Sequence, residues 1–162
     1  MTVRSEGMRA RRLRSAAVAG IVALACCRPG DAQSPKANTP VGRWETVDDV
    51  TGKVNSVVRI WEGNGKLYGR IEKLIDGDPK DPDPRCVRCS GGLKDQRLIG
   101  LRILWDLTPE GDRWIGGDIL DPDTGRIYRC SIALEDGGKK LKVRGFVGFS
   151  MFGRTEHWLR DQ

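Results

Sequence analysis

The chain has 162 residues, of which 38% are hydrophobic and 31% are charged, a size and composition that fit one soluble domain and exclude a polytopic membrane protein. Its formal net charge of +6 is uneven, because residues 1–32 hold six basic and two acidic residues and leave only +2 on residues 33–162. The basic signature of nucleic-acid binding therefore largely disappears from the main part of the chain, and we expect no nucleic-acid partner.

Residues 1–32 have the pattern of a secretory signal peptide. An arginine-rich start precedes the apolar run Ala16–Cys27, and the small residues Gly30 and Ala32 stand at positions −3 and −1 of a cleavage site before Gln33. This run is too short to span a bilayer, which takes about 20 residues. We expect export to the periplasm or the medium, with no membrane span after cleavage. An uncleaved interfacial anchor is the alternative.

Export would place the remaining cysteines where disulfides form. Cleavage removes Cys26 and Cys27, although lipidation at Cys26 is another possible outcome. Cys86, Cys89 and Cys130 then remain. Because three is an odd number, at least one thiol is unpaired within the chain or binds something else.

Strands dominate the rest of the chain. A polar, proline-bounded tether at residues 33–40 leads into a domain expected at residues 41–162. Short joints rich in Gly, Pro, Asn and Asp favour tight turns between antiparallel neighbours. Eight strands are predicted, at Gly42–Asp48, Asn55–Trp61, Lys66–Ile75, Leu98–Leu107, Arg113–Leu120, Arg126–Leu134, Lys140–Val147 and Arg154–Arg160.

The alternation of apolar and polar residues predicts which sheet face is buried. One face of the fourth strand is expected to carry Ile99, Leu101, Ile103, Trp105 and Leu107. With almost no helix to cover the apolar face, the sheet must close on itself. The predicted fold is therefore all-β: an antiparallel up-and-down barrel of about eight strands, just wide enough inside for side chains or one small ligand.

One connection breaks the pattern. Residues 76–97 lack a strand signal, and loops longer than about 12–15 residues are usually functional or disordered. The loop carries Cys86-x-x-Cys89, for which the export context favours a disulfide, either local or shared with Cys130. Zinc bound by these cysteines with His157, a redox-active pair and two inert thiols remain as alternatives.

The first and last strands carry a recognisable pair of residues. Gly42-Arg43-Trp44 opens the domain and Arg160 lies near its end. They resemble the Gly-x-Trp motif and C-terminal arginine of lipocalins and their calycin relatives. In a closed meander these strands are neighbours, so Trp44 can plug one end of the barrel while Arg160 crosses its face. Arg154 competes for the arginine role, and an ordinary core position for Trp44 is the alternative.

A wider resemblance covers most of the domain. Its phrases, in order, are Gly42–Asp49, Lys66–Ile71, Cys86–Cys89, Gly117–Pro122 with Gly125, and Arg144–Gly148 followed by Gly153–Thr155 and Trp158. Together they resemble a family of exported bacterial proteins catalogued as domain of unknown function 2147. The resemblance implies a lipocalin-like barrel and an envelope location, and it implies no established activity.

The sequence predicts a non-catalytic binding protein. There is no serine-centred elbow to partner His157 and no glycine-rich phosphate loop, so we expect no catalytic residues, no cofactor and no metal. The main hypothesis is that the barrel binds a small, partly apolar or hydrophobic ligand. The expected pocket walls are Ile103, Trp105, Tyr128, Ile132 and Val143.

These large inward side chains could instead fill the barrel completely. The alternative function is then a structural or protein–protein interaction module whose partner the sequence does not identify. Its binding surface would be an exposed aromatic patch near Phe146, Phe149, Met151 and Phe152.

Overall fold

The structure is a computed structural model that describes residues 38–48, 51–75, 77–148 and 153–161. The signal peptide predicted at residues 1–32 and most of the predicted tether lie outside the described residues, so both remain predictions. Three members of the predicted aromatic patch also lie outside this range: Phe149, Met151 and Phe152.

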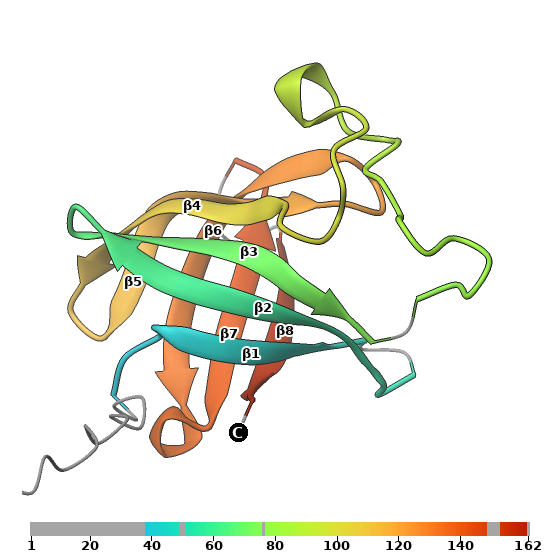
Figure 1. Cartoon of the computed structure of the whole chain (residues 1–162). Coiled ribbons are helices and arrows are strands. Elements are labelled where there is room, and N and C mark those ends of the chain that lie inside the picture. Colours follow the sequence, from blue (N-terminus) through green and yellow to red (C-terminus); the bar gives the residue numbers. More distant parts are fainter. Residues whose placement is uncertain (1–37, 49–50, 76, 149–152, 162) are drawn as a thin grey trace, which may run out of the picture. The chain divides into compact units, whose positions relative to one another are not determined.

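Eight strands in the described part of the chain form one closed antiparallel barrel. Each strand pairs with its neighbours in sequence, and β1 also pairs with β8, which closes the barrel (Figure 1). The predicted fold class is confirmed. The strands are β1 Gly42–Val47, β2 Val54–Gly63, β3 Lys66–Leu74, β4 Arg102–Glu110, β5 Arg113–Asp121, β6 Arg126–Glu135, β7 Lys140–Phe146 and β8 Gly153–Arg160, with short 3₁₀ turns η1 Gly91–Leu93 and η2 Asp136–Gly138.

The meander gives the barrel two different ends. At the closed end lie the short β2–β3, β4–β5 and β6–β7 turns, the segment before β1 and the end of β8. At the open end lie the β1–β2, β3–β4, β5–β6 and β7–β8 connections, including the long β3–β4 loop that projects from the barrel (Figure 1). No helix among the described residues is long and apolar enough to cross a membrane.

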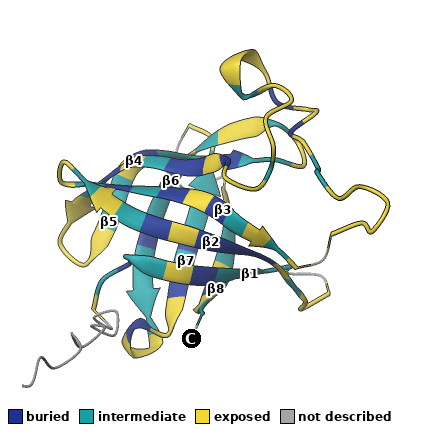
Figure 2. Ribbon diagram, viewed as in Figure 1, coloured by how far each residue is buried: buried dark blue, intermediate teal, exposed yellow. Residues whose placement is uncertain are grey.

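The interior toward the closed end is tightly packed. Trp44, Leu104, Leu107 and Leu141 are fully buried there. Gly69 faces Leu104 so closely that an added Cβ would lie 3.0 Å from the leucine side chain. Along the strands, buried and exposed residues alternate (Figure 2). This half of the barrel is therefore filled by side chains.

The alternation predicted for β4 is wrong around Trp105. The register of β4 against β3 shifts twice, and Asp106 has a positive φ of 61°. These β-bulges add residues to β4, so Leu104 and Leu107 both become fully buried. Trp105 instead lies on the outer side of β4, in a shallow depression that it shares with Leu93.

The long loop also extends further than predicted. β4 begins at Arg102 rather than at Leu98, and Ile99, expected on the buried face, is 54% exposed. The loop backbone is held to β3 instead, because Gly100 N–H donates to the Ile71 carbonyl at 2.8 Å. The residues just before β4 thus border the open end without joining the strand.

Candidate functional site

Trp44 and Arg160 lie together at the closed end. The guanidinium carbon of Arg160 is 4.2 Å from the Trp44 ring centroid. Arg160 donates from Nε to the Gly138 carbonyl at 2.6 Å and from Nη2 to the Thr39 carbonyl at 2.8 Å, and Trp44 Nε1 donates to the Pro40 carbonyl at 2.7 Å. Burial lowers the pKa of Arg160 below its ordinary value. These contacts join three chain segments across the end of the barrel.

The other residues considered for closure take different places. Gly42 begins β1, in register with Ile60 of β2. Arg154, the competing candidate for the arginine, lies at the opposite end of β8 from Arg160 and lines the cavity described next. The arginine over Trp44 is therefore Arg160.

A cavity of about 820 Å³ occupies the interior toward the open end. Small residues, including Thr46, Ser56 and Gly145, leave this space, because they replace the bulky side chains of the closed half. The volume falls within the range of about 300–1,000 Å³ that is usual for small-molecule sites. Apolar side chains form much of the inner wall: Ile71, Ile103, Leu120, Val143 and Trp158.

Polar groups are concentrated at a few positions in the cavity. The hydroxyl oxygens of Thr46 and Ser56 are 2.8 Å apart and hydrogen-bonded. Glu156 accepts a hydrogen bond from Trp158 Nε1 at 3.2 Å and pairs with Arg154 Nε at 3.6 Å. The remaining charged lining residues are all acidic: Asp48, Asp78, Asp81, Asp121 and Asp123. Arg154 is the one basic residue in the described lining, so the field at the mouth is negative.

The five predicted wall residues do not all share this site. Ile103, Tyr128 and Val143 line the cavity. Ile132 is buried in the core in register with Val143 but is not part of the lining, and Trp105 lies outside because of the β4 bulges.

Sequence reasoning missed Glu156 and Trp158 as lining residues. They stand two positions apart on β8, so alternation along the last strand could have placed both on the inner face. Gly145 also lines the cavity, and alternation from Val143 would place it on the same inner face, but the empty space beside a glycine is not visible in the pattern of one strand.

The CxxC segment forms a local disulfide. Cys86 and Cys89 are bonded, with their Cα atoms 5.3 Å apart, and the disulfide prediction is confirmed for this pair. The segment sits on the β5–β6 turn, where Arg88 Nη1 donates to the Asp123 carbonyl at 3.0 Å. A Cβ added to Gly125 would lie only 2.0 Å from the Arg88 carbonyl oxygen. The loop thus packs directly against one side of the cavity mouth.

The zinc site considered from the sequence is not assembled. Cys86 and Cys89 are bonded to each other, and Cys130 is a free, buried thiol. His157 lies on the outer face, with Nε2 3.4 Å from Glu135 Oε2. Within the described ranges, no group of three or more His, Cys, Asp or Glu side chains is placed to hold a metal ion.

Cys130 should make stability depend on pH. Burial raises the pKa of this thiol well above its ordinary value of 9.0, and the charges of Asp118 and Glu156 raise it further. Below the ordinary value the thiol is protonated in both states. Above it, the unfolded chain releases a proton that the folded chain retains, so the free energy of unfolding should fall by about 1.4 kcal/mol per pH unit.

Urea unfolding between about pH 8 and 10 measures this effect. The matched Cys130→Ala variant should lack that part of the decrease, because it has no thiol to titrate. Equal pH slopes in the two proteins would contradict a buried, neutral thiol.

Comparison with known proteins identifies the family. A family model described as "Uncharacterized protein conserved in bacteria (DUF2147)" matches residues 42–160. The chain belongs to the DUF2147 family. This confirms the family expected from the ordered sequence phrases. Among curated proteins, no match was found for this DUF2147 chain.

A solved structure shares the fold. It is titled "Protein HP1028 from the human pathogen Helicobacter pylori belongs to the lipocalin family". The two chains superpose with a TM-score of 0.65 and are 22% identical, over 75% of the DUF2147 chain and 82% of the other. At this identity the likeness establishes a common lipocalin-like barrel.

Proposed function

We propose that this DUF2147 protein is a non-catalytic binding protein that takes up a small, partly apolar ligand at the open end of its barrel. The cavity of about 820 Å³ carries this proposal. A barrel that served only as a scaffold would be more stable if side chains filled that space, because unfilled volume forfeits packing contacts. The closed half of the same barrel is packed in that way.

The lining indicates how such a ligand would lie. Its apolar part would contact Ile103, Val143 and Trp158 on the inner wall, while its polar part would face Glu156 or the acidic mouth. The negative field disfavours an anionic head group and favours hydrogen-bond donors or positive charge. The predicted signal peptide supports a place of action in the periplasm or outside the cell.

The alternative of a packed barrel with a surface aromatic patch has less support. The interior contains the cavity, and Phe146, the patch residue within the described ranges, lines it. The structure therefore favours binding inside the barrel over binding through that patch.

Native mass spectrometry of the purified protein tests the proposal directly. The native mass should exceed the denatured mass by the mass of a bound small molecule, which would also identify the ligand. In parallel, the neutral fluorophore N-phenyl-1-naphthylamine should bind and brighten in the apolar cavity.

Replacing Gly145 with leucine should weaken this binding about tenfold. A Cβ at this position would make ordinary contacts, 3.5 Å from Ile119 and 3.6 Å from Tyr128, so the rest of the leucine would occupy cavity space. Displacing about 60 Å² of ligand contact corresponds to roughly 1.4 kcal/mol, a factor of ten in affinity. Titration with the fluorophore measures the change.

Gly92→Leu is the matched control. Gly92 lies in the exposed loop with nothing within 4 Å of an added Cβ, so this variant should bind the fluorophore like the parent protein. Equal native and denatured masses, together with no fluorophore uptake, would overturn the proposed function. Unchanged affinity in Gly145→Leu would place binding elsewhere on the protein.

A further inference from the structure

Four arginines stand side by side across the outer face of β1 to β4. Arg43 is in register with Arg59, Arg59 with Arg70, and Arg70 with Arg102. All four are exposed. Like charges placed directly opposite each other weaken a sheet. A breach of this local rule is expected mainly where a surface has a function.

Carboxylates neutralise only the first member of the row. Arg43 pairs with Glu72 and with Asp161, each at 3.0 Å. Within the described part of the chain, the other three arginines form no ion pair. Three adjacent positive charges therefore remain without a described carboxylate at ion-pair distance, and only Arg102 is attracted by a more distant one, Asp106.

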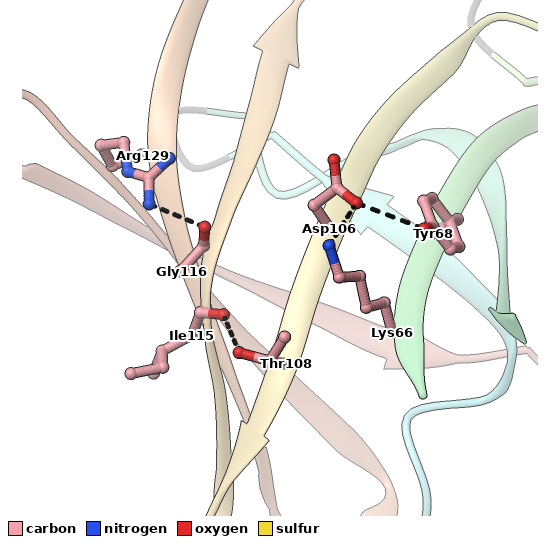
Figure 3. Close-up of polar contacts among 7 residues, drawn as sticks. All are labelled: Lys66, Tyr68, Asp106, Thr108, Ile115, Gly116 and Arg129. Atoms are coloured by element: carbon pink, nitrogen blue, oxygen red, sulfur yellow. Dashed lines mark hydrogen bonds and ion pairs between the residues drawn. The ribbon is translucent and has the colours of Figure 1, made fainter. Parts of the chain in front are cut away.

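Asp106, an acidic residue near Arg102, is already engaged. Asp106 accepts hydrogen bonds from Lys66 Nζ at 3.1 Å and from Tyr68 Oη at 3.2 Å (Figure 3). These contacts hold the carboxylate to β3 on the side facing Lys66. The positive charge of Lys66 balances the negative charge of Asp106.

Two aromatic rings lie beside the unpaired arginines. Trp61 and Tyr68 stack with their ring centroids 5.9 Å apart. The guanidinium carbon of Arg70 is 5.8 Å from the Trp61 ring, and that of Arg102 is 5.4 Å from the Tyr68 ring. Stacking uses the flat side of a guanidinium and leaves its N–H edge available for an acceptor.

We propose that this arginine–aromatic face, formed by Arg59, Arg70, Arg102, Trp61 and Tyr68, docks on the surface of an anionic phospholipid bilayer. Guanidinium groups bind phosphate oxygens in a bidentate manner, and basic residues are attracted to anionic leaflets. Trp and Tyr are the side chains enriched where membrane meets water. The positive charge and the aromatic side chains of the arginine–aromatic face therefore both fit the surface of an anionic bilayer.

The extent and position of the face support a bilayer over a single small anion. The three arginines lie on three adjacent strands and so span about 10 Å, given strand spacings of about 4.8 Å. A leaflet presents many phosphates to such a row at once. The acidic mouth of the cavity would be repelled by the same leaflet, so the barrel would approach on its side, with β2 to β4 facing the lipid.

Vesicle co-sedimentation of the protein as recovered from cells tests the proposal. Mass spectrometry should first verify that the N-terminus is the same in the parent protein and in every variant. The protein should sediment with vesicles of phosphatidylglycerol and phosphatidylcholine and should stay in solution with phosphatidylcholine alone. Removing the three charges in R59Q/R70Q/R102Q should lower the partition coefficient about 100-fold, since each contributes roughly one kcal/mol. Added salt should weaken binding of the parent protein.

A second triple variant provides the control. K53Q/R126Q/K139Q removes the same charge from three other exposed positions and should lower partitioning only a few-fold. The R59Q/R70Q/R102Q barrel should retain its thermal midpoint, because substitution relieves repulsion. Equal losses in the two triple variants would overturn the assignment to this face. If the parent protein did not bind anionic vesicles, the bilayer would be overturned as the partner. Binding to single-stranded RNA in place of vesicles would identify a nucleic acid as the partner of this face.

Discussion

Replacing Trp44 with alanine should lower the free energy of unfolding by about 3–5 kcal/mol. The side chain is 0% exposed and packs within the core beneath Arg160. Its removal leaves a cavity, and it also leaves the Pro40 carbonyl without its indole donor. Urea unfolding followed by circular dichroism measures the loss.

Trp61→Ala is the matched control for this prediction. Trp61 lies on the outer face and is only partly buried, where it stacks with Tyr68. Its truncation should cost about 1 kcal/mol, the usual scale for one exposed aromatic pair. If Trp44→Ala were no more costly than Trp61→Ala, Trp44 would not be the residue that holds the closed end together.

Replacing Gly125 with alanine should release the disulfide segment from the β5–β6 turn. The residue has φ of 70°, a conformation that costs a non-glycine residue about 1–2 kcal/mol. The added Cβ would also meet the Arg88 carbonyl at 2.0 Å, so the loop must move away. Cys86 and Cys89 are at most 5% exposed, so their reduction by dithiothreitol requires the loop to open.

The rate of that reduction measures the release. A loss of roughly 1.4 kcal/mol in docking would raise the open population, and with it the reduction rate, about tenfold. Gly52→Ala separates the effect of backbone strain from that of the steric clash with Arg88. Gly52 has φ of 69°, as strained for alanine as that of Gly125, but nothing lies within 4 Å of an added Cβ. Gly52→Ala should lose stability while its disulfide is reduced at the parent rate. Equal rates in Gly125→Ala and Gly52→Ala would show that the steric contact does not anchor the loop.

Local sequence signals were sufficient to predict the meander. Alternating residues and turn-forming dipeptides such as Asn64-Gly65 depend only on near neighbours, so they identify strands and joints directly. The neighbour relation of the first and last strands follows from closure, whereas the choice of Trp44 and Arg160 rests on their resemblance to the lipocalin motif.

Features that depend on register could not be predicted in this way. Asp106 has a positive φ although it is not a glycine, so the sequence carries no signal for this bulge. The bulge nevertheless moves Trp105 to the outer side of β4. The arginine row requires Arg59, Arg70 and Arg102 to align across three strands, and bulges set that alignment. The cavity depends on volumes summed over many strands, which the pattern of any one strand does not contain.

The even number of strands also determines how the protein can be attached to other molecules. Chain entry at Thr39 and exit at Asp161 both lie at the closed end, where Trp44 and Arg160 are paired neighbours. A fusion joined directly at Thr39 or at Asp161 would therefore leave the mouth unobstructed. A short linker could join the two ends, with new ends opened at the exposed Gly52 turn. Such a circular permutant would carry its fusion beside the mouth. The same barrel could therefore be attached to another molecule through its closed end or through its open end.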